Sequence, residues 1–108
     1  MILLISPYHT ATDCAAQIES AAHAPVKTVN SIRLALAALR TQDFEAVVVD
    51  ENLLEATPGA TDSLVQRMGT GTPVFLDMAC MKPQRVAKMV SIALRRRELE
   101  HRLARTQA

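Results

Sequence analysis

Four short apolar runs, separated by segments with helical periodicity, constrain what this chain of 108 residues can fold into. The runs cover residues 1–5, 26–29, 46–49 and 72–76, and each is expected to form a strand. The first and third contain only apolar residues, which is typical of strands buried on both faces. Strands that alternate with amphipathic helices are joined by right-handed crossovers into a parallel sheet with helices on both faces.

The helical segments between these runs are placed by spacing and by capping residues. Thr10 with Asp13 is expected to cap the first helix, and Ser31 the second. After a loop that holds Pro58 and Gly59, a short third helix is marked by Leu64, Val65 and Met68. The last helix is expected over residues 83–105. The sequence therefore predicts a single α/β domain, a three-layer doubly wound parallel sheet of four strands with a long C-terminal helix.

Composition excludes several classes of protein. No apolar run approaches the ~20 residues that span a bilayer, and the N-terminal run lacks the basic leader and cleavage site of a signal peptide. Two cysteines are too few for a disulfide framework, so a reducing cytoplasm is expected, with both thiols packed as small apolar groups. Arginine clusters near the C-terminus, at Arg95, Arg96, Arg97, Arg102 and Arg105.

This arginine cluster has two interpretations, a solvated helix face or a phosphate-binding patch. The net charge is only +1, and the segment has neither interleaved aromatic residues nor a groove-reading motif. We therefore expect neither a nucleic acid nor a membrane as partner.

The segment around Asp50 carries the most informative pattern. Phe44-Glu-Ala-Val-Val-Val-Asp50-Glu-Asn-Leu53 resembles the sequence around the phosphoacceptor aspartate of receiver domains, the flavodoxin-like (CheY-like) domains of two-component signalling. Thr72-Pro-Val-Phe-Leu76 resembles their fourth strand, and Lys82-Pro83 their Lys-Pro pair. The resemblance assigns residues 1–97 to a receiver-like domain and residues 98–108 to an extension of its last helix.

The chain departs from receivers at the residues that handle phosphate. In receivers an acidic pair after the first strand holds Mg²⁺, which prefers oxygen ligands, and here Ser6 and Pro7 stand in its place. The family's Thr or Ser that hydrogen-bonds the phosphoryl group falls on Met78, whose thioether cannot donate a hydrogen bond. One helix and the fifth strand are also absent before Lys82.

Three family positions remain. Asp50 is the candidate phosphoacceptor, Asn52 is the residue whose carbonyl would face the metal, and Lys82 is the lysine that would bridge to Asp50. Asp77 and Glu55 are candidate replacements for the missing acids, but strand alternation is expected to turn Asp77 away from Asp50. His9, in the loop after the first strand, is interpreted as a surface residue. No metal site is therefore predicted, and Mg²⁺ is expected only if the domain is phosphorylated.

The last helix has two apolar sides. One side is expected to pack on the sheet through Val86, Val90, Ala93, Leu94 and Arg97. The other is a heptad seam with spacing 3, 4, 3, 4, formed by Met89, Ile92, Arg96, Leu99 and Leu103. The seam is interpreted as a wide buried face with a frayed end, as a surface for self-association, or as a helical lead into a further domain.

The expected function is a non-catalytic pseudo-receiver, a protein-interaction module in signalling that acts as a homodimer. The alternative is an active receiver that accepts a phosphoryl group on Asp50 from a histidine kinase. A small α/β enzyme of another kind ranks last, because the sequence has no Gly-rich phosphate loop, nucleophile elbow or cluster of metal-ligating residues.

Overall fold

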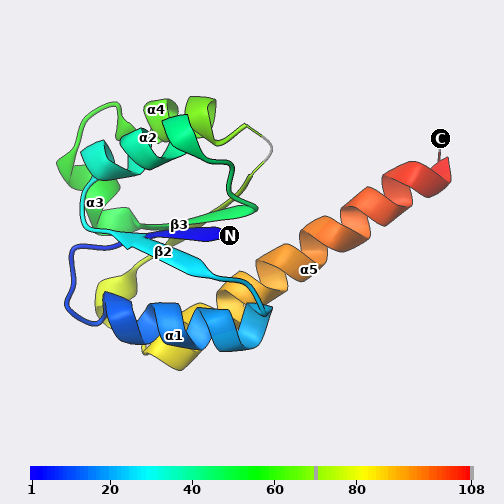
Figure 1. Ribbon diagram of the computed structural model, residues 1–108, viewed down its shortest axis with the longest axis horizontal. Helices are drawn as coiled ribbons and strands as arrows, with labels where there is room; N and C mark the ends of the chain where they lie inside the picture. The colour runs from blue at the N-terminus through cyan, green and yellow to red at the C-terminus, as the bar shows by residue number, and fades with distance from the viewer. Residues whose placement is uncertain (70, 108) are drawn as a thin grey trace.

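A sheet of four parallel strands lies at the centre of the computed structural model, which describes residues 1–69 and 71–107 (Figure 1). The strand order is β2-β1-β3-β4, so the two most apolar strands occupy the middle. This is the flavodoxin-like α/β fold that the sequence predicts. The strands are β1 (Ile2–Ile5), β2 (Val26–Val29), β3 (Ala46–Asp50) and β4 (Thr72–Leu76).

Helices cover both faces of the sheet and make the domain three-layered. Helices α1 and α5 lie on one face, and α2 and α4 lie on the other (Figure 1). A six-residue helix, α3, and a 3-10 turn, η1, follow the ends of β3 and β4. The helices are α1 (Ala11–Ala22), α2 (Ile32–Thr41), α3 (Glu51–Ala56), α4 (Ala60–Met68), η1 (Met78–Cys80) and α5 (Pro83–Gln107).

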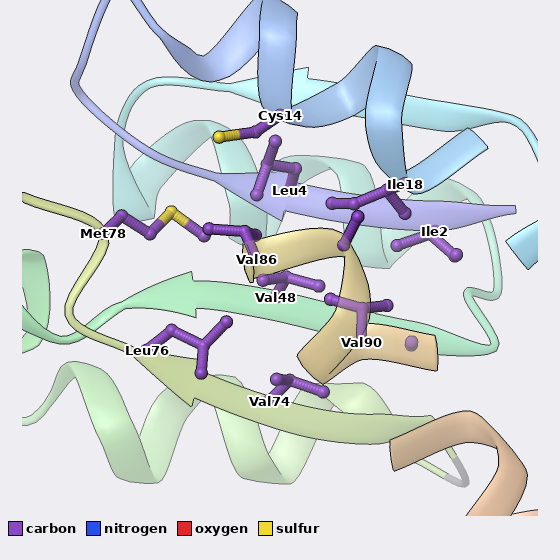
Figure 2. Close-up of a cluster of buried hydrophobic side chains, with 12 residues drawn as sticks. Ile2, Leu4, Cys14, Ile18, Val48, Val74, Leu76, Met78, Val86 and Val90 are labelled. Carbon is purple, nitrogen blue, oxygen red and sulfur yellow. The ribbon is translucent and has the colours of Figure 1, made fainter. Parts of the chain in front are cut away.

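Aliphatic side chains fill the two interfaces between sheet and helices. Alternate residues of each central strand face opposite layers, so that Leu4 and Val48 face α1 and α5 while Leu3 and Val47 face α2 and α4. Figure 2 shows the first of these layers, where Val86 and Val90 of α5 lie over the strands. The predicted packing side of the last helix is thus confirmed for its apolar residues.

Local details differ from the sequence prediction in three places. The predicted loop after β3 contains α3, which begins directly after Asp50. Thr10 has helical dihedral angles, whereas a capping side chain needs an extended backbone, and it makes no capping hydrogen bond. Val65 is 51% exposed, because Leu64 and Met68 already occupy the buried side of α4.

Ser31 caps α2 as predicted, because its side-chain oxygen accepts a hydrogen bond from the Leu34 N–H at 3.2 Å.

The last strand and the last helix of the described residues are β4 and α5. β4 is an edge strand, and η1 is the one helical turn between it and α5 in the described residues, which agrees with the predicted sheet of four strands. α5 contains 25 residues; its first half packs on α1 and β4, and its second half projects from the body of the domain (Figure 1). No helix in the described ranges combines the length and apolarity needed to cross a membrane.

Candidate functional site

Asp50 ends β3 at the carboxyl edge of the sheet, where parallel α/β proteins place their ligand sites. Its side chain is fully buried. The Oδ1 atom accepts a hydrogen bond from the backbone N–H of Met78 at 3.2 Å and another from Asn52 Nδ2 at 3.3 Å. The Oδ2 atom is buried and has no hydrogen-bond partner among the described residues. Asp50 therefore anchors the turn that follows β4.

The Asn52 amide links the polar side chains at this edge. Besides Asp50, its Nδ2 donates to Asp77 Oδ1 at 2.9 Å and to the Tyr8 hydroxyl oxygen at 3.4 Å. The prediction that Asp77 turns away from Asp50 is therefore wrong. β4 ends at Leu76, and the backbone of Asp77 already turns toward η1, so strand alternation no longer fixes where its side chain points. Two carboxylates thus share one amide.

Tyr8 completes this polar cluster and was missed in the sequence analysis. It lies in the loop between β1 and α1, half-buried, with its hydroxyl against Asn52. The pKa of the Tyr8 phenol is raised above its ordinary value, mainly because the side chain is partly removed from water and to a smaller extent because of the negative charge of Asp50. The hydrogen bond from Asn52 lowers this pKa. Its place in the loop after the first strand was the available signal, because that loop ends at the same edge as Asp50.

Ser6 and Pro7 directly follow β1, at the positions where the resemblance to receivers implies an acidic pair. Ser6 is buried, and its Oγ accepts a hydrogen bond from the Tyr8 N–H at 3.3 Å; Pro7 is exposed. Mg²⁺ requires oxygen ligands in an octahedral arrangement, whereas here an N–H₂ group bridges the two carboxylates. The described residues contain no group of three or more His, Cys, Asp or Glu arranged to hold a metal ion. A receiver-type magnesium site does not fit this donor set.

Met78 and Lys82 do not act on Asp50 through their side chains. The Met78 side chain is buried in the apolar layer and extends toward Val86 (Figure 2), and only its backbone contacts Asp50. Lys82 is exposed just before α5, and in the described part of the chain it makes no hydrogen bond or ion pair with Asp50. The bridge from Lys82 to Asp50 that the resemblance to receivers implies is therefore not formed among the described residues. Only a short connection separates β4 from α5, so Lys82 lies directly before the first residue of α5.

The remaining candidates lie outside the cluster. Glu55 and His9 are exposed. Cys14 is buried, as expected, and its burial raises the pKa of its thiol. Cys80 is exposed, which contradicts its predicted packing, because it ends the turn η1 at the surface; the charge of Asp77 raises the pKa of this thiol.

The predicted seam runs along the outer side of α5. Met89 is half-buried, whereas Ile92, Leu99 and Leu103 are 52%, 43% and 60% exposed. Arg96, between them, pairs with Glu100 of the same helix at 3.1 Å. The seam is therefore an exposed apolar stripe, and the alternative of a wide buried face is wrong for its C-terminal half.

The arginines of α5 differ in their partners. Arg95 and Arg102 form ion pairs with Glu98, and Arg97 Nη1 donates to the Glu45 carbonyl and to Thr72 Oγ1. The side chain of Arg105 lies outside the described residues.

Comparison of the chain with protein-family models, with curated protein sequences and with solved structures gives no match. The fold itself hosts many unrelated activities, so the geometry of the site carries the functional argument.

Proposed function

We propose that this chain is a degenerate relative of receiver domains and acts as a non-catalytic protein-interaction module in signalling, with a second copy of itself as its partner. One observation carries the proposal: the carboxylate at the phosphoacceptor position is fully buried and engaged by the chain's own backbone and Asn52. The two free thiols suit a reducing cytoplasm, which forms part of the proposal.

Phosphoryl transfer to Asp50 would need the carboxylate to be open to a phosphodonor and a cation to neutralise the incoming charge. The Asn52 amide beside Asp50 also contacts Tyr8 and Asp77. The acidic pair that would bind the cation is replaced by Ser6 and Pro7. A switch based on Asp50 would first have to break the Met78 hydrogen bond that holds the end of β4. These features favour an Asp50 that stabilises the fold.

The interaction surface that we propose is the seam of α5. Three large apolar side chains, Ile92, Leu99 and Leu103, are exposed along one side of the helix. The second half of α5 projects into water (Figure 1), and such a short helical segment is only marginally stable by itself. Most helices in proteins are stabilised by packing an apolar face. A partner that covers the seam would remove this apolar surface from water.

Sedimentation velocity tests this function. The wild type and Asp50→Asn are expected to sediment as dimers at micromolar concentration, because association does not use the Asp50 charge. Leu99→Asp combined with Leu103→Asp is expected to give monomers, whereas His101→Asp, on the same helix but outside the seam, should remain dimeric. A wild type that is monomeric at high micromolar concentration, or an association that changes in Asp50→Asn, would contradict the proposal.

A further inference from the structure

The path of α5 leaves Ile92, Leu99 and Leu103 exposed along the seam, whereas Met89, at the start of the seam, packs against the domain. Ile92 and Arg96 border the edge of β4. Arg97 hydrogen-bonds the body of the domain, at 2.7 Å to the Glu45 carbonyl and 3.0 Å to Thr72 Oγ1. Val86, Val90 and Arg97 define the side of the helix that faces the sheet, and the seam lies about a third of a turn around the helix from them. A helix of a second copy can therefore lie along the exposed part of the seam, residues 92–103, while α5 keeps its contacts with its own sheet.

The free edge of β4 offers a poorer surface for a partner. Pro73 is in this strand, and its imide nitrogen cannot donate a hydrogen bond to an added strand. Proline in an edge strand is one of the features by which proteins prevent the pairing of sheet edges. Association through α5 is favoured over association through the sheet.

The charges that flank the seam distinguish parallel from antiparallel pairing. With Ile92 and Leu99 at d positions, Arg96 and Leu103 are at a positions, Arg95 is at g and Glu100 is at e. In a parallel pair, the g residue of one helix faces the e residue five positions further along the other, which sets Arg95 against Glu100. An antiparallel pair would set g against g and e against e, bringing like charges together.

The ion pairs now made by these residues are exchangeable. Arg95 binds Glu98 at 3.3 Å and Glu100 binds Arg96 at 3.1 Å, and all four side chains are at least half exposed. Pairs of this kind contribute little to stability, so their rearrangement upon association costs little. A single charged residue at an a position, here Arg96, lowers the affinity but specifies the register of a two-stranded coil.

We infer that two copies of this chain associate through residues 92–103 of α5 as a parallel, in-register two-stranded coiled coil, with Arg95 of each copy opposite Glu100 of the other. The inference rests on the proposed function, because it specifies the geometry of the self-association proposed above. The two domains then lie at the same end of the coil, and both helices continue from them in one direction.

Cysteine crosslinking tests the register. In a Cys80→Ser background, which removes the exposed thiol, Ile92→Cys and Leu99→Cys are introduced separately, and each protein is oxidised at the concentration where it is dimeric. A parallel in-register coil places each new cysteine beside its own copy, so both variants are expected to form covalent dimers on a non-reducing gel. The background protein without a new cysteine should form none, since Cys14 is buried.

Charge exchange tests the orientation independently. Arg95→Glu and Glu100→Arg each create two like-charged contacts in a parallel dimer, and each is expected to weaken association about tenfold, while the double exchange restores it. Crosslinking at one position only, or a tighter dimer in Arg95→Glu, would overturn the parallel register. A dimer that crosslinks at neither position would overturn the coil but leave the proposed self-association intact. A protein that is monomeric at every concentration would remove the proposed self-association itself.

Discussion

Substitution of Asp50 by Asn and by Ala separates the hydrogen-bonding role of this residue from its charge. Asn keeps an oxygen that can accept from the Met78 N–H, whereas Ala leaves this N–H without an acceptor. Because the contact is buried, the unsatisfied donor is expected to cost about 1–3 kcal/mol. Asn52 adds little to this difference, since its amide retains Asp77 and Tyr8 as acceptors.

Thermal and chemical denaturation followed by circular dichroism measure the effect. Each kcal/mol corresponds to roughly 4–8 °C in a domain of about this size, so Asp50→Ala should melt at least roughly 4 °C below Asp50→Asn. Asp50→Asn should be at least as stable as the wild type, because it removes a buried charge beside the Asp77 carboxylate. If Ala is tolerated as well as Asn at this position, Asp50 does not hold the turn after β4.

Three further substitutions test other parts of the structure. Val48→Asp should abolish folding, because burying a charge in the central strand costs more than the total free energy of unfolding of about 5–15 kcal/mol. Val65→Asp, on the exposed side of α4, is the control and should melt like the wild type. Asp77→Asn should lower the pKa of Cys80 and speed its alkylation at a fixed pH, and an unchanged rate would show that the carboxylate does not act on this thiol. Tyr8 is the only tyrosine, so phenolate absorbance reports its titration, which should have its midpoint above the ordinary pKa of 10.0. The folded state holds this proton more tightly than the unfolded chain, so the contribution of Tyr8 to stability is complete below about pH 10 and is lost as pH rises through the folded value; Tyr8→Phe should not show this loss.

The sequence was sufficient to predict the sheet and its covering helices because both depend on local periodicity. The apolar runs of β1 and β3 require burial on both faces, and the spacing of Val86 and Val90 requires one buried side of α5. The parallel orientation of the strands then follows from the alternation of strands and helices. These features depend on many residues together, so a single unexpected side chain does not change them.

The polar cluster depended on single backbone turns, which periodicity does not describe. The direction of Asp77 is set by the turn from β4 into η1, and Met78 acts through its N–H, which no side-chain pattern reveals. Tyr8 joins the cluster from a loop in which its backbone N–H donates a hydrogen bond to the Ser6 hydroxyl oxygen. The sequence therefore predicted which edge of the sheet carries polar residues, and the structure was needed to show how they contact one another.

The central claim, that Asp50 supports the fold and does not accept phosphate, is tested most directly by intact mass spectrometry. The protein is incubated with Mg²⁺ and acetyl phosphate, with Asp50→Ala as the control, and the experiment is repeated with an acyl phosphate of different shape. We predict no added mass with either donor. Addition of one phosphoryl group to the wild type, absent from Asp50→Ala, would contradict this account and identify the chain as an active receiver.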